Sequence, residues 1–330
     1  MPKGVLVFAE VTEGKISSIA AELLGCGRGL AAEMGGDLSA VLVGSNVASL
    51  APSAIAAGAD RVFVVDDPLL VDYATDSYVS VLEKVVKQAS PGVVLLGQTS
   101  IGRDLAPRLA FRLGTAATMD CVALAIDPAT KRLMPTKPVY GGNARAIFTY
   151  ETDPQVATVR AKVMSPMAPD ASRKGEVVNV AAGLDPAAIR TKVVQKVKEE
   201  LKGIKLEEAA VVISGGRGMG GPEGFKDLDE LAKVLHGAVG ASRPACDSAW
   251  IPDTQQVGLT GKVVTPDLYI AVAISGSSQH MAGCSGAKVI VAVNKDPEAN
   301  IFKEARYGIV GDWKKVLPAF TAKVKELLAQ

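Results

Sequence analysis

Short apolar runs alternate with amphipathic stretches along the first part of the chain. Each run is apolar at nearly every position, whereas the stretches between runs repeat apolar residues at helical spacing. Strands that are apolar on both faces and separated by helices indicate a parallel sheet covered on both sides. The pattern predicts strands at residues 5–9, 38–43, 61–65 and 92–96 and helices at residues 16–34, 52–57, 73–88 and 102–113.

From residue 115 to 164 the pattern changes to strands without helices, with a glycine-containing turn at residues 139–144. We expect antiparallel strands here that extend the edge of the sheet. Residues 165–208 are rich in proline, alanine and charge, which predicts a linker with a bridging strand or helix.

A second alternation of strands and helices begins at Ala209. It predicts strands at residues 211–214, 238–241, 268–274 and 289–293 and helices at residues 225–235, 279–283 and 313–328. The predicted fold class is therefore α/β, with two domains at residues 1–206 and 207–330, each built on a parallel sheet.

Composition narrows the partners of this protein. Hydrophobic residues make up 48% and charged residues 22%, which is typical of a globular protein. The formal net charge of +1 gives no basic excess for nucleic acid or an anionic membrane surface. An apolar strand begins almost at the N-terminus, and no apolar run approaches the roughly 20 residues that span a bilayer. We therefore expect a cytoplasmic protein without direct membrane insertion.

The common catalytic and metal-binding motifs are missing from the sequence. The 4 cysteines are widely spaced and form no CxxC pair, which argues against zinc and iron–sulfur sites and for free, buried thiols. The chain also lacks G-x-x-x-x-G-K-[ST], G-x-S-x-G and H-E-x-x-H. We predict no catalytic residues and no metal ligands.

A glycine-rich loop at residues 214–221 follows a predicted strand and precedes a predicted helix, the usual place for an anion-binding loop. Gly216, Gly218 and Gly221 match G-x-G-x-x-G. An NAD site also needs an acid at the end of the second strand, but that strand ends at Ser242 and Arg243. A phosphate site for another nucleotide, an NADP site using Arg243, and a glycine turn without ligand remain open.

Three polar side chains follow clusters of small residues in the last third of the chain. Arg243 could stack on an aromatic ring and impose a positive field on it. Thr260 could hydrogen-bond a ring nitrogen. His280 follows residues 275–278 at a helix start, where backbone donors and an imidazole would together stabilise negative charge on a ring. The alternatives are a surface pair of Arg243 with Asp247, a β-turn threonine and a satisfied helix-start histidine.

Asn294 and Asp312 each follow an apolar run of the second domain. Ligands of open α/β sheets lie beyond the carboxyl ends of the strands, so both residues could bind ribose or adenine edges. Capping of the loops also explains these residues, and their spacing alone favours that alternative. In the first domain residues 97–104 also follow a strand and open a helix, and we favour a structural or interface role there.

Taken together, the segments at residues 214–218, 239–243, 256–262, 275–280 and 293–299 resemble, in order and spacing, the alpha (large) subunit of electron-transfer flavoproteins. The resemblance extends over essentially the whole chain. It implies an FAD held mainly by the C-terminal domain. It also implies an N-terminal domain similar to the adenine-nucleotide-hydrolase fold that packs against a smaller beta subunit.

The resemblance also implies a role for each matching residue. Arg217 would meet the FAD phosphates or adenosine part, Arg243 would lie over the isoalloxazine, and His280 would reach the pyrimidine carbonyl. Leu259 stands where many relatives have glutamine, so only its backbone would contact the flavin. The residues assigned to FAD in this way are Arg217, Ser242, Arg243, Val257, Gly258, Leu259, Thr260, Ser275, Gly276, Ser277, Ser278, Gln279, His280, Asn294, Asp312 and Trp313.

The function implied is that of an electron carrier subunit and not of a stand-alone enzyme. Such a heterodimer takes electrons from an acyl-CoA dehydrogenase-type donor, as in fatty acid β-oxidation, and passes them to a quinone reductase or another redox acceptor. One alternative is the alpha subunit of an electron-bifurcating, NADH-oxidising complex. The other is a non-redox protein that binds NADP or an adenylate.

Overall fold

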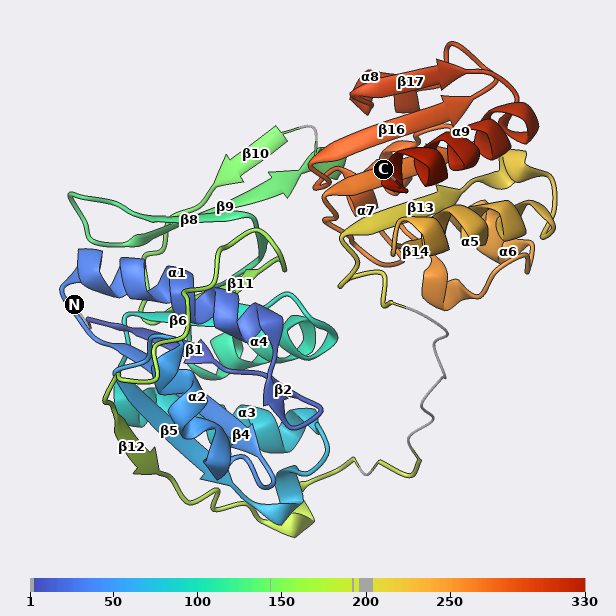
Figure 1. Ribbon diagram of the computed structural model, residues 1–330. Helices are drawn as coiled ribbons and strands as arrows, with labels where there is room; N and C mark the ends of the chain where they lie inside the picture. Colours follow the sequence, from blue (N-terminus) through green and yellow to red (C-terminus); the bar gives the residue numbers. More distant parts are fainter. Residues whose placement is uncertain (1–2, 143, 192, 196–203, 330) are drawn as a thin grey trace. The chain divides into compact units, whose positions relative to one another are not determined.

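The computed structural model describes residues 3–142, 144–191, 193–195 and 204–329. The chain divides into two compact units (Figure 1). Unit 1 comprises Met1–Val139 and Arg145–Val197, and unit 2 comprises Tyr140–Ala144 and Lys198–Gln330. The domain boundary expected between residues 206 and 207 stays a prediction.

Unit 1 is built on a 7-stranded sheet in the order β12-β5-β4-β1-β6-β11-β7, in which every neighbouring pair is parallel. The inner strands are buried at nearly every position, as their continuous apolar runs predict. The strands are β1 (Val5–Phe8), β4 (Leu38–Gly44), β5 (Arg61–Asp66), β6 (Val93–Gly97), β7 (Ala117–Cys121), β11 (Gln155–Val159) and β12 (Glu176–Asn179).

Helices cover both faces of this sheet and form two separate hydrophobic clusters. Helices α1 (Ser18–Met34) and α2 (Ala51–Ala56) pack on one face, and α3 (Thr75–Ala89) and α4 (Ser100–Arg112) pack on the other. Thr99 accepts a hydrogen bond from the Gly102 backbone at 3.0 Å and so caps α4. This confirms the structural reading of that loop.

The strands after residue 115 differ from the expectation. β11 lies between β6 and β7 and is parallel to both, so this region inserts an inner strand into the sheet instead of adding antiparallel strands to its edge. All five residues of β11 are buried, which agrees with its position between two strands. The antiparallel pair β8 (Ala123–Ile126) and β9 (Leu133–Val139) instead forms a separate 3-stranded sheet with β10 (Ala144–Ile147).

The linker region contains a strand, as predicted, and this strand, β12, pairs with β5 at the edge of the unit 1 sheet. The remaining short elements lie in turns and loops. They are β2 (Val11–Thr12), β3 (Lys15–Ile16) and the 3₁₀ helices η1 (Ala48–Leu50), η2 (Pro68–Leu70), η3 (Tyr140–Gly142), η4 (Pro186–Ala188), η5 (Arg217–Met219) and η6 (Asp253–Gln255).

Unit 2 is a second open parallel sheet, with 5 strands in the order β14-β13-β15-β16-β17. The chain runs from β13 outward to β14, and from β15 onward it builds the sheet in the opposite direction. This makes the gap between β13 and β15 the topological switch point of the sheet. The strands are β13 (Val211–Gly215), β14 (Ala238–Ala241), β15 (Leu268–Val272), β16 (Val289–Asn294) and β17 (Tyr307–Val310).

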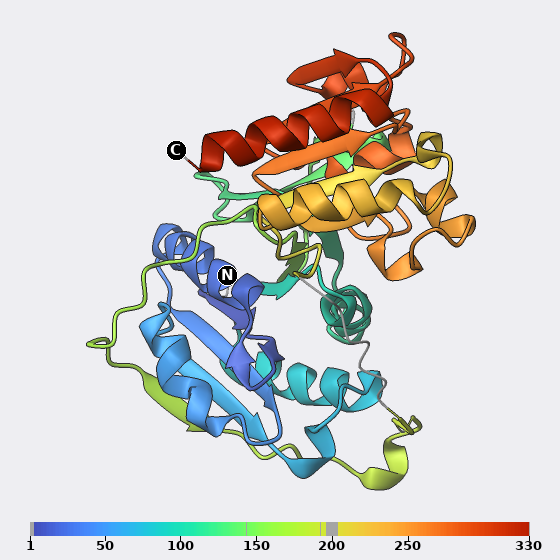
Figure 2. The same ribbon diagram turned by 45° about the vertical axis from the view of Figure 1, so that its right-hand side comes forward.

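Helices also cover both faces of the unit 2 sheet. α5 (Gly224–Val234), α6 (Arg243–Asp247) and α9 (Trp313–Leu328) pack on one face, where α5 and α9 lie side by side (Figures 1 and 2). α7 (Ser278–Cys284) and α8 (Ile301–Glu304) pack on the other face. The short helices α6 and α8 are absent from the sequence-based prediction.

The thiols confirm the prediction of free cysteines. Cys26 is partly buried, whereas Cys121, Cys246 and Cys284 are buried, and none forms a disulfide. Burial raises the pKa of the Cys246 thiol to about 11 and that of the other three to about 12. Among the described residues there is no group of side chains that could hold a metal ion. No helix in the described part of the chain is long and apolar enough to cross a membrane.

Candidate functional site

The carboxyl ends of the unit 2 strands meet at one edge of the sheet, where loops after β13 and β15 lie against each other. The Gly216 backbone donates a hydrogen bond to the Val272 carbonyl at 2.9 Å. A Cβ atom on Gly216 would lie 2.1 Å from the Ala273 carbonyl oxygen. Only glycine permits this approach, so the glycine-rich loop is required by packing at the switch point whether or not it binds a ligand.

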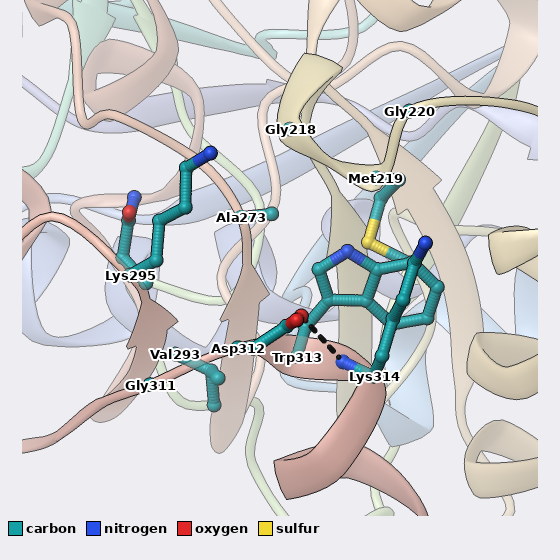
Figure 3. Close-up of a pocket in the computed structure, with 11 residues that line it drawn as sticks. Gly218, Met219, Gly220, Ala273, Val293, Lys295, Gly311, Asp312, Trp313 and Lys314 are labelled. Atoms are coloured by element: carbon teal, nitrogen blue, oxygen red, sulfur yellow. Dashed lines mark hydrogen bonds between the residues drawn. The ribbon is translucent and has the colours of Figure 1, made fainter.

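A pocket of about 240 Å³ opens at this edge, lined by the ends of β13, β15, β16 and β17 (Figure 3). Asn294, Asp312 and Trp313 line it as strand-end residues, consistent with their predicted place. Its lining also includes part of the glycine-rich loop at residues 214–221 and of the segment at residues 293–299, whereas the sequence-based reasoning did not single out Ala273, Gly311 or Lys314. The full lining is Gly218, Met219, Gly220, Ala273, Val293, Asn294, Lys295, Gly311, Asp312, Trp313 and Lys314.

Asn294 and Asp312 both stabilise the loops in which they lie. The Asn294 side chain donates to the Ile274 carbonyl at 2.8 Å and accepts from the Asp296 backbone at 3.0 Å. Asp312 accepts from the Lys314 backbone at 3.0 Å and so caps α9. The capping interpretation is therefore confirmed for both residues. A ligand that binds these side chains must do so while they keep their hydrogen bonds to the loops. The Lys314 ammonium lies 5.9 Å from the centre of the Trp313 ring.

The loop that holds Val257 to Thr260 is joined to the sheet and to α7. Val257 donates its backbone N–H to the Ala241 carbonyl at 2.8 Å, and Leu259 donates to the Gln279 carbonyl at 2.8 Å. The Leu259 side chain is exposed, and its backbone N–H group is already occupied by the hydrogen bond to Gln279. Thr260 lies in a turn, where its hydroxyl accepts from the Gln256 side chain at 2.9 Å. The β-turn interpretation of Thr260 is confirmed.

Ser242 and Arg243 begin the short helix α6 at the end of β14. Ser242 is buried, and its backbone donates to the Gly215 carbonyl at 3.0 Å. The Arg243 Nε atom lies 3.4 Å from the Asp247 carboxylate, in an ion pair in which both side chains are more than half exposed. This is the surface pair that the alternative interpretation describes. Because such pairs contribute about 0–1 kcal/mol, the guanidinium can leave Asp247 at little cost.

Residues 275–279 carry the chain from β15 into α7. Ser275, Ser277, Ser278 and Gln279 are exposed, whereas Gly276 is buried with φ 80°. The first hydrogen bond of α7 runs from the Met281 backbone to the Ser277 carbonyl at 2.9 Å. The N–H groups at the start of a helix have no partner within it. They therefore form an electropositive surface beside the exposed hydroxyls of Ser277 and Ser278.

His280 lies in α7 but points into the core of unit 2. Its Nε2 atom lies 2.9 Å from the hydroxyl of the buried Tyr269. Its Nδ1 atom is buried and has no hydrogen-bond partner among the described residues. Burial lowers the pKa of the imidazole to about 4, although the nearby Val257 backbone opposes this shift. At neutral pH the ring is therefore uncharged, so it adds a dipole and not a cation to the field expected at this helix start.

Arg217 lies on η5, between Gly216 and Gly218, with its side chain exposed. Each predicted residue follows a strand end or belongs to a loop bonded to one, so the backbone of all of them lies at the same edge of one sheet. Of these residues, Asn294, Asp312 and Trp313 line the pocket, whereas the His280 side chain points away from the edge into the core. Close-packed glycine backbone, exposed hydroxyls, exposed cations and a pocket beside an indole are the groups that bind a phosphate-bearing dinucleotide.

The fold is an open α/β sheet, and the groups at its switch point are typical of nucleotide-binding α/β proteins. Comparison with known proteins is more specific. Residues 5–185 match the electron transfer flavoprotein domain, and residues 205–285 match the electron transfer flavoprotein FAD-binding domain. The chain belongs to the electron transfer flavoprotein alpha subunit family and carries its FAD-binding domain.

Individual relatives support the same assignment. The chain is 48% identical over 326 residues to an electron transfer flavoprotein subunit alpha from Thermoanaerobacterium thermosaccharolyticum, covering 98% of both chains. It is 46% identical over 327 residues to one from Megasphaera elsdenii, covering 98% of this chain and 97% of the relative. It is 44% identical over 328 residues to protein FixB of Clostridium saccharobutylicum, covering 99% and 98%. The resemblance read from the sequence is confirmed.

Proposed function

We propose that this chain pairs with an electron-transfer flavoprotein beta subunit and relays electrons between two partner proteins. The observation that carries the proposal is the glycine-lined switch point within a chain that matches the FAD-binding domain. When bound, the FAD supplies the redox chemistry, because it accepts electrons from one protein and gives them to the next. The protein binds and orients the cofactor and sets the electrostatic field around it.

The adenosine end of FAD would occupy the pocket lined by Asn294, Asp312 and Trp313. Residues 275–279 would hold the diphosphate and the ribityl chain. The exposed serines and the unpaired N–H groups at the start of α7 support this role. Arg217 would neutralise the phosphates, since its side chain is exposed beside the glycine loop at the switch point.

The isoalloxazine would lie among the loops that follow β14 and β15. Arg243 would cover its ring, with Ser242, Thr260 and the backbone of residues 257–259 along its polar edge. The weak, exposed pair that Arg243 forms with Asp247 supports this role, because a ligand can displace it. His280 would reach the pyrimidine carbonyl only after its imidazole turns outward, because the ring now points into the core of unit 2 beside Tyr269.

The donor would be an acyl-CoA dehydrogenase-type enzyme, as in fatty acid β-oxidation, and the acceptor a quinone reductase or another redox protein. The beta subunit would pack against unit 1. The relatives that are named as alpha subunits support a heterodimer. The chain would act as an electron carrier subunit with no reaction of its own.

The test is to purify the chain together with its beta subunit, count the flavins and supply electron donors. We expect a yellow heterodimer with a single FAD that an acyl-CoA dehydrogenase reduces in the presence of acyl-CoA. A second flavin together with reduction by NADH would favour the electron-bifurcating function over that of a simple carrier. A correctly folded, colourless heterodimer that takes up no added FAD would refute both functions.

A further inference from the structure

Ala273 has a backbone conformation that alanine rarely adopts. It follows β15 at the switch point with φ 54°, in the left-handed region. A Cβ atom makes this region unfavourable, and glycine is the residue that occupies it without strain. Strained residues of this kind persist where the surroundings hold them, and they gather at ligand sites.

The surroundings of Ala273 hold its backbone firmly. Its N–H donates to the Val293 carbonyl at 2.8 Å, which continues the pairing of β15 with β16. On the other side a Cβ on Gly218 would lie 3.0 Å from the Ala273 Cβ, and a Cβ on Gly216 would meet the Ala273 carbonyl. The hydrogen bond to Val293 and the close approach of Gly216 and Gly218 hold the backbone of residue 273, and a glycine would follow the same path without strain. What the methyl group contributes therefore depends on what it contacts.

The methyl group lines the pocket at the strand ends. In Figure 3 it lies between the Gly218–Gly220 loop and the side chains of Lys295 and Asp312. With Met219, Val293 and Trp313 it makes up the apolar part of the lining. We infer that the Ala273 methyl group is an affinity-determining contact for the adenosine part of FAD, present despite the backbone strain that it causes. This inference rests on the proposed function and adds a residue to its site.

Two effects of opposite sign follow for the substitution Ala273→Gly. Without the cofactor, glycine removes the left-handed strain, so the melting temperature of the flavin-free protein should rise by about 2–4 °C. With the cofactor, the ligand loses contact with one methyl group. Burial of about 0.8 kcal/mol per methylene corresponds to about fourfold weaker binding of FAD.

The chain offers a matched control in Ala249. It has nearly the same conformation, with φ 56°, in unit 2, but its side chain is exposed and lies outside the pocket lining. Ala249→Gly should therefore raise the melting temperature in the same way and leave the affinity for FAD unchanged.

The experiment uses the heterodimer after its flavin has been stripped, with FAD and ADP as ligands in fluorescence and calorimetric titrations. The inference is supported if Ala273→Gly weakens the binding of FAD and of ADP by similar factors, and if Ala249→Gly leaves the binding of both ligands unchanged. It is overturned if Ala273→Gly binds FAD as tightly as the wild type, or if the control loses as much affinity. A wild-type heterodimer that binds no FAD would overturn the proposed function itself, and this result is distinct because it appears without any substitution.

Discussion

Acidification should selectively destabilise unit 2 through His280. The chain has only 2 histidines, His236 and His280. His280 is 5% exposed, and burial lowers its pKa from an ordinary value of 6.5 to about 4. Between these two values the unfolded chain binds a proton at this site and the folded chain does not. Stability is therefore fully present above pH 6.5 and is lost as the pH falls from 6.5 towards 4.

The size of the effect follows from the same two pKa values. The contribution of His280 should fall by about 2 kcal/mol between pH 8 and pH 5, and by about 3 kcal/mol at pH 4. Asp229 of unit 2 acts in the opposite direction, because partial burial raises its pKa and the folded state holds its proton more tightly than the unfolded state. The test must therefore compare variants and not pH values alone.

The assay is urea unfolding of the flavin-free chain at pH 8 and pH 5, followed by tryptophan fluorescence. Both of the 2 tryptophans, Trp250 and Trp313, lie in unit 2, so the signal reports on that unit. In His280→Gln the free energy of unfolding should fall by about 2 kcal/mol less between pH 8 and pH 5 than in the wild type. The control His236→Gln, at an exposed position, should show the same fall as the wild type. An equal loss in the wild type and in His280→Gln would refute a neutral, buried imidazole at this position.

Three further outcomes are expected. Gly276→Ala should destabilise unit 2 by about 3 kcal/mol or more, because residue 276 has φ 80° and the new Cβ would lie 2.3 Å from a backbone nitrogen. The control Gly220→Ala has nearly the same conformation, with φ 81°, but open space around the new Cβ, so it should cost only about 1 kcal/mol in the same urea titration. Arg243→Ala should lower the flavin midpoint potential in spectroelectrochemistry because it removes a cation, and an unchanged potential would contradict its place over the ring. Tyr269→Phe should cost about 1–3 kcal/mol in unfolding experiments because His280 Nε2 is left buried without its partner, and a cost below about 0.5 kcal/mol would contradict that hydrogen bond.

Local patterns in the sequence predict most of this fold, because each strand and helix carries its own periodicity. The strand at residues 238–241 and the last helix have the predicted bounds. The order of strands is a different matter, since it depends on contacts between distant segments. Nothing in the run at residues 155–159 says that it pairs with both β6 and β7, so its inner, parallel position was missed.

The same difference between local patterns and long-range contacts decides which parts of the site could be predicted. Residues after strand ends could be predicted because parallel strands bring those ends together, and the structure gathers all of them at one edge. The inward direction of His280 and the left-handed backbone of Ala273 could not be predicted. The first depends on the Tyr269 hydroxyl beneath α7. The second depends on the close approach of Gly216, which only the folded backbone creates.

The high pKa values of the four thiols have a practical consequence for labelling this protein. Since their pKa values lie at about 11 to 12, almost no thiolate forms at neutral pH to react with maleimide or nitroxide reagents. A cysteine introduced on an exposed helix of each unit would then be labelled selectively in an otherwise native sequence. Spin labels placed in this way would measure the distribution of distances between the two units in solution, with and without the redox partners.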